Sequence, residues 1–294
     1  MSQGREKEAL EVLGVENMDL LLKRGFLAFK EQDYDTAEKV FSLILRLQPG
    51  NAEAWYGKGV ILAWSGEFKE ALCCYDKALK GDPDNTLFLL NKGGALLGLG
   101  KHKEAICCYD KALKGDPDNI QLWLNKGAAF GCLGKSEEAL QCYDEAVKID
   151  PDNADSWYGR GVSLLQLEKY DEAHTSFEEA LKRDPDDVPS WFNKGAALRD
   201  MGKYDEAVPC FDEVLKRDPG NAEAWHNKGE ALVNLEKYKK ALHCFDKTLR
   251  INPRHGGAWY YKGEALKELG RLKEAASCFE KAAKIDTGFW YGEE

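Results

Sequence analysis

Residues 73–85 read CCYDKALKGDPDN, and the same thirteen letters return unchanged at residues 107–119, which is 34 positions later. The spacing continues through most of the chain, where prolines recur every 34 residues and five of them follow an aspartate. These prolines are Pro49, Pro83, Pro117, Pro151, Pro185, Pro219 and Pro253. Self-similarity at a fixed period of this length is the sequence signature of a repeat protein. The pattern therefore predicts a tandem array of similar structural units.

The array accounts for almost the whole chain when each of these prolines is taken as position 32 of a repeat. Eight repeats of 34 residues then cover 272 of the 294 residues. Numbered 1 to 8, they span residues 18–51, 52–85, 86–119, 120–153, 154–187, 188–221, 222–255 and 256–289. Residues 1–17 are predicted to form an amphipathic helical cap on repeat 1, and residues 290–294 form an aromatic and acidic C-terminal tail.

Apolar residues within each repeat recur at helical spacing, first at positions 4, 8 and 11 and then at positions 20, 24 and 27. This spacing predicts two helices per repeat. Position 8 is glycine, position 20 is alanine and position 24 is Phe or Tyr in every repeat. Because glycine costs a helix about 1 kcal/mol relative to alanine, we expect it to let the second helix approach closely. Glycines between the helices, such as Gly66 and Gly100, are expected to end the first helix in a left-handed conformation.

A helix–turn–helix unit of 34 residues, with tryptophan mostly at position 4, glycine at 8, alanine at 20, an aromatic at 24 and proline at 32, resembles the tetratricopeptide repeat. The resemblance covers all eight repeats. It implies an all-α fold, a right-handed superhelical α-solenoid in which stacked neighbours bury the apolar stripe that one helix pair cannot bury alone. It also implies a module that binds proteins or peptides.

Composition limits the class of protein further. The chain is 44% apolar and 31% charged, which suits a soluble protein. Its first residues lack the uninterrupted apolar run of a signal peptide or a membrane-spanning helix, so we expect no membrane association and a cytoplasmic location. The net charge of −10 opposes the phosphate contacts on which nucleic-acid binding depends. Nucleic acid is therefore not an expected partner.

Nine cysteines raise the question of a redox or metal site. Six of them share position 23, next to the aromatic residue that is expected to enter the core: Cys74, Cys108, Cys142, Cys210, Cys244 and Cys278. Packed helices lie on the order of 10 Å apart and a disulfide needs α-carbons within about 7 Å, so these thiols are expected to stay reduced. A row of equivalent positions also cannot converge on the tetrahedron that zinc requires. We expect buried structural side chains, no metal and no cofactor.

Catalytic patterns are missing from the sequence. It contains no phosphate-binding loop, dinucleotide-binding, HExxH or GxSxG motif. His243 and Cys244 are adjacent, but neighbours on a helix point about 100° apart, so the pair is interpreted as an exposed histidine beside a buried cysteine. The sequence predicts that the protein is not an enzyme.

The face of each first helix that points away from the core is the candidate functional surface. At about 100° per residue, positions 2, 5, 6, 9, 12 and 13 cluster opposite positions 4, 8 and 11. The resemblance implies that this face lines a concave groove that holds peptide segments. Apolar residues at position 5 form its expected floor: Tyr56, Leu90, Leu124, Tyr158 and Phe192. In repeats 7 and 8 the face is expected to be acidic, through Glu230, Glu264 and Glu268.

Position 6 carries an asparagine in four repeats, each time in the triplet Asn-Lys-Gly: Asn91, Asn125, Asn193 and Asn227. The arrays of the O-linked N-acetylglucosamine transferase and of the peroxisomal import receptors carry asparagines at this point that hydrogen-bond a peptide backbone, and the resemblance implies the same role here. Gly57 and Gly159 interrupt the series in repeats 2 and 5. The alternative is that asparagine is a tolerated polar residue at the groove edge.

Two hypotheses of function remain open at this point. In the first, the protein is an adaptor whose groove binds a peptide or protein segment. In the second, it is a structural scaffold that self-associates, with its groove or its ends occupied by sister chains. The tail residues Phe289, Trp290 and Tyr291 fit both, because they either fold back onto the last helix or dock on a neighbouring molecule.

Overall fold

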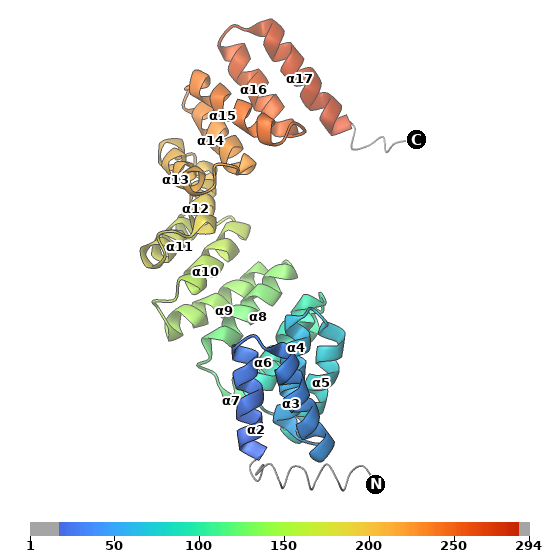
Figure 1. The fold of residues 1–294 in the computed structure, drawn as a ribbon. Helices are drawn as coiled ribbons and strands as arrows, with labels where there is room; N and C mark the ends of the chain where they lie inside the picture. The colour runs from blue at the N-terminus through green and yellow to red at the C-terminus, as the bar shows by residue number, and fades with distance from the viewer. Residues whose placement is uncertain (1–17, 288–294) are drawn as a thin grey trace. The chain divides into compact units, whose positions relative to one another are not determined.

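The computed structural model describes residues 18–287, where every regular element is an α-helix. Figure 1 shows the helices following one another along the chain. The predicted helical cap (1–17) and the aromatic tail (290–294) lie outside the described residues, as do the last two residues of repeat 8. The chain divides into two compact units, residues 1–149 and 150–294. The division falls after the second helix of repeat 4, although the 34-residue period continues through it.

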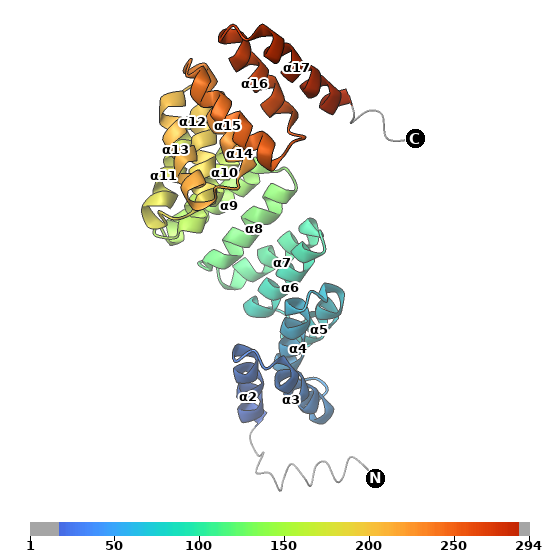
Figure 2. The same ribbon diagram turned by 45° about the horizontal axis from the view of Figure 1, so that its top comes forward.

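The N-terminal unit contains repeats 1 to 4. The two helices of each repeat pack together, and the second helix of each of repeats 1 to 3 packs on the first helix of the next repeat. Figure 2 shows this succession from a second direction. The helices described in this unit are α2 (Met18–Lys30), α3 (Tyr34–Leu47), α4 (Ala52–Trp64), α5 (Phe68–Gly81), α6 (Thr86–Gly98), α7 (His102–Gly115), α8 (Ile120–Cys132) and α9 (Ser136–Ile149).

The C-terminal unit contains repeats 5 to 8 and is built in the same way. Its described helices are α10 (Ala154–Gln166), α11 (Tyr170–Arg183), α12 (Val188–Asp200), α13 (Tyr204–Arg217), α14 (Ala222–Asn234), α15 (Tyr238–Ile251), α16 (Gly256–Glu268) and α17 (Leu272–Thr287). In both units every first helix begins at the first residue of a 34-residue repeat as counted from the sequence.

Capping residues at position 34 fix where each following first helix begins. The Oδ1 atom of Asn51 accepts a hydrogen bond of 2.9 Å from the N–H of Ala54, and most other repeats have an asparagine or aspartate in the same role. Before α16 the Nδ1 atom of His255 accepts from Ala258 instead, at 3.1 Å. Such a cap satisfies one of the free N–H groups at a helix start and contributes about 1 kcal/mol.

The turn between the two helices requires a left-handed residue, as the sequence predicts. Five repeats have glycine at this point, with φ between 69° and 83°. The other described turns with positive φ place Gln32, Glu168 and Glu236 in the same conformation, with φ of 63°, 58° and 58°. The backbone geometry of the turn is therefore kept even where the side chain does not favour it.

The core of each repeat is formed by the alanine at position 20 and the aromatic ring at position 24. Ala105 and Tyr109, for example, are fully buried. A Cβ atom placed on Gly93 at position 8 would lie only 2.3 Å from the ring of Tyr109, and the glycine of every other repeat meets its own aromatic ring at 2.5 to 2.8 Å. The prediction that glycine permits a close approach is confirmed, and the group that approaches is the aromatic ring.

The tryptophans at position 4 are less deeply buried than the sequence predicts, whereas Leu21 and Leu89 at this position are buried. The indole rings there are half-buried, and each Nε1–H donates to the carbonyl of the proline six residues earlier, as in Trp55 to Pro49 at 2.8 Å. In repeats 2 to 8, position 3, which we did not assign to the core, is buried instead, for example at Ala54 and Ser190. The physical reason is that an indole carries one N–H group that needs an acceptor, so it lies at the edge of the core.

The basic residues at position 7 connect neighbouring repeats. The Nζ atom of Lys92 lies 2.7 Å from Oδ1 of Asp76 in the preceding repeat. Equivalent pairs, with distances of 2.5 to 2.8 Å, are Lys126–Asp110, Lys194–Glu178, Lys228–Asp212 and Lys262–Asp246. Partly exposed ion pairs contribute about 0–1 kcal/mol each. Their regular recurrence helps to fix the register of each first helix on the second helix before it.

Candidate functional site

The surface of the first helices that carries position 6 is called the asparagine face below, and it is described separately in the two units. In the N-terminal unit Asn91 lies on α6. Its Nδ2 donates to the hydroxyl of Tyr56 at 3.1 Å and to the carbonyl of Leu87 at 2.9 Å. Its Oδ1 has no hydrogen-bond partner among residues 18–287. Asn91 therefore keeps one acceptor available for a ligand.

Asn125 occupies the same position one repeat later, on α8. Its Oδ1 accepts a hydrogen bond of 3.0 Å from Nε2 of Gln121, one turn earlier on the same helix. Its Nδ2 has no acceptor within the part of the chain that the structure describes. The two neighbouring asparagines therefore leave opposite ends of their amides free, an acceptor on Asn91 and a donor on Asn125.

The two asparagines line one groove of about 400 Å³. The groove also contacts Val60, Ala63, Trp64, Phe68, Tyr75, Leu90, Gly94, Ala95 and Gln121. Trp64 at its edge is 71% exposed, which is unusual for a side chain with so much apolar surface. Tyr75 is fully buried at its base, and its hydroxyl has no hydrogen-bond partner in the described structure. The groove thus combines an apolar lining with a few polar groups.

The gap in the asparagine series at repeat 2 has a steric cause. A Cβ atom placed on Gly57 would lie 2.4 Å from the ring of Phe41 on α3. No side chain fits there while Phe41 occupies the core of repeat 1. Position 6 of repeat 2 is therefore glycine because of the packing between α3 and α4.

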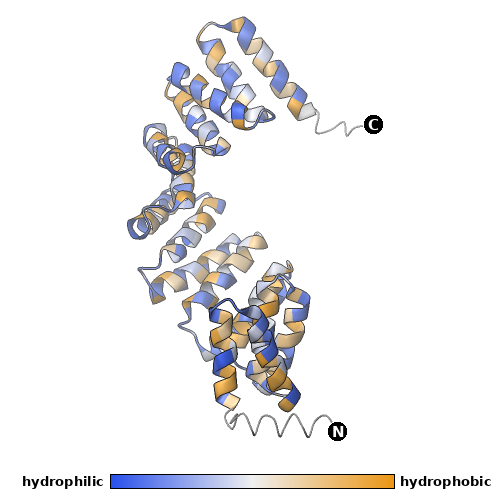
Figure 3. Ribbon diagram, in the orientation of Figure 1, coloured by the Kyte–Doolittle hydropathy of each residue, from blue (hydrophilic) through white to orange (hydrophobic). Residues whose placement is uncertain are grey.

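The other predicted residues of the N-terminal unit are Tyr56, Leu90 and Leu124, and of these Leu90 lines the groove. Tyr56 is 9% exposed and stacks on Phe88, with ring centroids 4.9 Å apart. Burial raises the pKa of the Tyr56 hydroxyl to about 12, so the group stays protonated at neutral pH. Leu90 and Leu124 are half-buried, and Leu90 lines the groove. The sequences of α4, α6 and α8 are rich in apolar residues, and Figure 3 colours the ribbon by the hydropathy of each residue.

In the C-terminal unit the asparagines make different contacts. The Nδ2 of Asn193, on α12, is 3.4 Å from the hydroxyl of Tyr158, which repeats the pairing of Asn91 with Tyr56. Asn227 on α14 is only 6% exposed, and its Oδ1 accepts a hydrogen bond of 3.0 Å from Nη1 of Arg199. This arginine contact could not be predicted from the sequence, because Arg199 lies on the preceding first helix.

Predicted acidic residues of this unit are tied to a local polar network. Glu230 Oε2 lies 3.7 Å from Nη1 of Arg199, and Glu230 Oε1 accepts a hydrogen bond of 3.2 Å from the hydroxyl of Tyr261. Burial raises the pKa of Tyr261, and the neighbouring Glu230 adds to this shift. Glu264 lies one repeat further on and is 3.8 Å from Lys267.

Phe192 at position 5 packs on Phe211, with ring centroids 6.0 Å apart.

A pair of histidines extends this network. His226, at position 5 of α14, has its ring 4.4 Å from the ring of His255, centroid to centroid. Burial, followed by the proximity of His255 and Arg199, lowers the pKa of His226 to about 4. His226 is therefore neutral at physiological pH. No role was expected for these histidines, because they lie at positions 5 and 34 of repeat 7, far apart along the sequence, and only helix packing brings their rings together.

The nine cysteines are all free thiols in this structure. The six at position 23 are buried, and burial raises the pKa of Cys142, Cys210 and Cys244 to about 11. Cys73, Cys107 and Cys132 are exposed.

Residues 18–287 contain no group of three His, Cys, Asp or Glu side chains arranged to hold a metal ion. Of the helices described, none has the length and apolar character needed to span a membrane.

Family comparisons agree with the fold. Models of the tetratricopeptide repeat match residues 28–83, 93–134, 124–188 and 176–208. A model described as anaphase-promoting complex, cyclosome, subunit 3 matches residues 200–282. Together with the helix pairs of both units, these matches show that the chain belongs to the tetratricopeptide-repeat family. Proteins with this fold generally serve as interaction modules.

Solved structures with the same architecture cover much of the chain. YrrB, described as a TPR protein with an unusual peptide-binding site, is 28% identical, with a TM-score of 0.58 over 64% of this chain and 97% of YrrB. MamA from Desulfovibrio magneticus RS-1 is 25% identical, with a TM-score of 0.55 over 57% of this chain and 96% of that one. A tetratricopeptide repeat protein from Parabacteroides merdae shares the fold at 21% identity, with a TM-score of 0.60 over 88% of this chain and 98% of that one.

A curated relative matches a much shorter segment. The DnaJ homolog subfamily C member 7 homolog of Schizosaccharomyces pombe is 41% identical over 54 residues, which make up 18% of this chain and 11% of the relative. The match therefore spans about a tenth of that protein's length and supports the repeat family alone.

Proposed function

We propose that this chain is a non-enzymatic adaptor that binds an extended peptide segment of another protein along its asparagine face. The observation that carries the proposal is the groove of about 400 Å³ in the N-terminal unit, where Asn91 and Asn125 stand over an apolar floor. YrrB, a structural neighbour, is described as having a peptide-binding site. A reducing compartment such as the cytoplasm suits a chain with nine free thiols.

The chemistry of the groove fits a peptide backbone. An extended chain presents N–H and C=O groups in alternation along its length. The free Oδ1 of Asn91 can accept from an N–H, and the free Nδ2 of Asn125 can donate to a C=O. Leu90 and Trp64 provide apolar surface for the ligand's side chains. Backbone contacts of this kind supply affinity with little dependence on sequence, whereas the apolar contacts supply specificity.

The C-terminal unit is proposed to hold a second stretch of peptide through Asn193, with Asn227 held in place by Arg199. Glu230 and Glu264 make this part of the face acidic. We therefore expect a basic or polar ligand segment here and an apolar segment at the N-terminal groove.

The test begins with a partner isolated by affinity capture on the parent chain, whose protected segment is then used as the ligand. Each Asn-to-Ala change is expected to weaken binding by about 0.5–1.5 kcal/mol, the usual net value of a hydrogen bond. The four changes together, at Asn91, Asn125, Asn193 and Asn227, should weaken it on the order of a hundredfold, measured by fluorescence anisotropy. Changing Leu90 and Leu124 to Glu should also weaken binding, because it places charge on the apolar floor.

A matched control carries Glu104→Lys and Glu138→Lys on the exposed side of second helices, where each glutamate pairs with a lysine one turn away. This control should bind normally. If the quadruple variant bound as tightly as the parent while the control lost binding, the recognition surface would be the second helices, and the proposal would be wrong.

Self-association is the second candidate function. It is favoured by exposed apolar side chains on the first helix of the array, where Leu20 is 63% and Leu27 is 55% exposed, and by Leu272 in the last repeat, which is 65% exposed. Size-exclusion chromatography with light scattering separates the two candidates. A monomer at every concentration supports the adaptor, whereas a defined oligomer supports the scaffold.

A further inference from the structure

Three lysines at the start of α15 have no carboxylate partner within residues 18–287. Lys237, Lys239 and Lys240 are exposed, and together they line a pocket of about 440 Å³. The rest of the lining consists of Val208, Asp212, Lys228, Leu232, His243 and Cys244. Asp212 is 2.5 Å from Lys228, with which it forms the ion pair found in most repeats. The three lysines therefore form a basic cluster in a pocket that is also lined by the apolar side chains of Val208 and Leu232.

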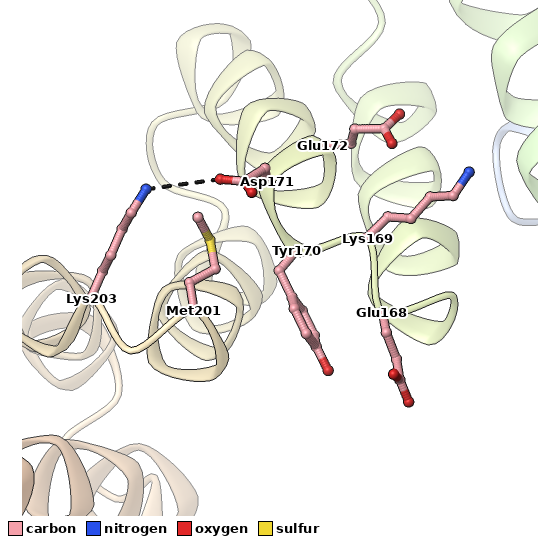
Figure 4. A pocket seen from close by; sticks show the side chains of 7 residues that line it. All are labelled: Glu168, Lys169, Tyr170, Asp171, Glu172, Met201 and Lys203. Atoms are coloured by element: carbon pink, nitrogen blue, oxygen red, sulfur yellow. Dashed lines mark ion pairs between the residues drawn. The ribbon is translucent and has the colours of Figure 1, made fainter.

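A second pocket beside these lysines has an equivalent two repeats earlier, where the charge pattern is opposite. Positions 15 to 19 of repeat 5, together with Met201 and Lys203 of repeat 6, line a pocket of about 480 Å³, and Figure 4 shows these side chains. The same positions of repeat 7, with Leu269 of repeat 8, line a pocket of about 310 Å³. Repeat 5 has Asp171 and Glu172 where repeat 7 has Lys239 and Lys240. Two carboxylates are thus replaced by two ammonium groups on the same scaffold.

This exchange removes two ion pairs that other repeats form. The basic residue at position 16 pairs with a glutamate at position 19, as in Lys101–Glu104 at 3.1 Å and Lys135–Glu138 at 2.8 Å. In repeat 7 the corresponding residues are Lys237 and Lys240, which have like charges.

The second missing pair links neighbouring repeats. In repeats 5 and 6, Lys203 Nζ lies 3.9 Å from Oδ1 of Asp171, the contact drawn in Figure 4. In repeats 7 and 8 the corresponding residues are Arg271 and Lys239, which line a common pocket of about 490 Å³. Arg271 pairs with Glu274 at 2.6 Å instead.

The arrangement works against folding stability. Like charges one helical turn apart repel each other, and the positive end of the helix dipole disfavours cations in the first turn of a helix. The first turn of α15 also contains no acidic residue. In a chain whose net charge is −10, such a concentration of lysine is not a consequence of composition. A surface that lowers stability in this way is typical of a binding site.

We propose that this surface, called the basic edge and defined by Lys237, Lys239 and Lys240, binds an acidic segment of a partner protein. The three ammonium groups are spread over adjoining pockets of about 440, 310 and 490 Å³, which suits a ligand with several separate carboxylates. Val208 and Leu232 in the same lining offer apolar contact to a side chain between them.

A polypeptide fits the basic edge better than a nucleic acid does. Asp212 and Glu236 line the same pockets, and they would face the continuous phosphate charge of a duplex at close range. The net negative charge of the chain adds to this repulsion. The basic edge lies at the start of α15, its first pocket is completed by residues of α13 and α14, and none of the asparagines lines that pocket. The inference therefore does not depend on the groove proposed above.

The test measures binding of a short fluorescein-labelled peptide of glutamates interrupted by leucines to the full chain. The variant Lys239→Asp with Lys240→Glu copies the pattern of repeat 5 and is expected to weaken binding by at least about tenfold. Its thermal unfolding midpoint should stay the same or rise, because it restores both ion pairs. The converse variant, Asp171→Lys with Glu172→Lys, is expected to gain a second binding site. Binding to the parent should fall as salt is added.

Several outcomes would overturn the proposal. Unchanged affinity in the Lys239→Asp, Lys240→Glu variant would show that the basic edge is not the site. Equal binding of a peptide with glutamine in place of glutamate would show that charge is not recognised. Displacement of the peptide by inorganic phosphate at matched ionic strength would indicate a simple anion site, and tighter binding of a DNA duplex would indicate a nucleic-acid surface. Tighter peptide binding after Glu293→Lys with Glu294→Lys would mean that the chain's own acidic residues occupy the edge.

Discussion

Glycine at position 8 is the point in each repeat where the two helices leave no room for a side chain. The neighbouring glycines Gly93 and Gly94 on α6 show this contrast directly. A Cβ atom on Gly93 would lie 2.3 Å from the ring of Tyr109, whereas a Cβ atom on Gly94 would meet no atom within 4 Å. The same residue type is therefore required by packing at one position and leaves open space at the next.

This contrast yields a matched pair of predictions. Gly93→Ala should lower the free energy of unfolding by about 1–2 kcal/mol, because overpacking costs about 1–3 kcal/mol and alanine recovers about 1 kcal/mol of helix propensity. Gly94→Ala should instead raise it by about 0.5–1 kcal/mol. Chemical denaturation of both variants checks these values. Equal effects of the two substitutions would contradict the packing argument.

At the scale of the element, a partly buried neutral histidine lies at the contact between α14 and α16. His226 on α14 contacts His255 before α16, Tyr261 on α16 and Phe245 on α15, with ring centroids 4.4, 5.7 and 6.0 Å away. The groups that oppose its protonation electrostatically are His255 and Arg199 on α12. Since these groups and burial lower the pKa of His226 to about 4, protonation in the folded state is opposed from several sides.

The stability of the protein is therefore expected to fall in mild acid. The usual pKa of histidine is about 6.5, and the lower pKa in the folded state means that the unfolded chain binds this proton more readily. Stability is fully present above about pH 6.5 and is lost as the pH falls towards about 4, by up to about 2 kcal/mol between pH 7 and pH 5.

The variant His226→Gln is the control for this prediction. Its denaturation midpoint should change less than that of the parent over the same pH interval, because glutamine does not titrate. Parallel curves for the two proteins would show that His226 does not govern the acid sensitivity. The comparison is best made above pH 5, since carboxylates begin to titrate below that value.

At the scale of the whole molecule, we expect the repeats to be exchangeable units. Residues 73–85 and 107–119 are identical, so removing residues 86–119 joins repeat 2 to repeat 4 through the same sequence that joins repeat 3 to repeat 4 naturally. The first helix of repeat 4 would then pack on α5 instead of α7, against nearly the same side chains.

This deletion should yield a soluble helical protein with slightly lower stability, because stability in an array is roughly a sum of repeat and interface terms. Removing only residues 102–119, which contain α7, should instead expose apolar surface and cause aggregation. Circular dichroism and light scattering distinguish these outcomes. Loss of all helicity after the whole-repeat deletion would contradict the array.

The sequence by itself determined the repeat length, the start of each described first helix and the left-handed turns. These features depend on local interactions: periodic apolar residues, capping side chains at position 34 and residues that permit positive φ. The same reasoning placed the asparagines on a common helix face, because helix periodicity is a local property.

Only the tertiary structure decided what surrounds those residues. It showed that Phe41 excludes a side chain at Gly57, that Arg199 engages Asn227, and that the tryptophans bond to proline carbonyls at the edge of the core. Each of these facts joins different repeats or different helices, and their distances depend on how whole helices pack. A period read along one chain fixes which residues are equivalent, but contact between them is a property of three-dimensional packing.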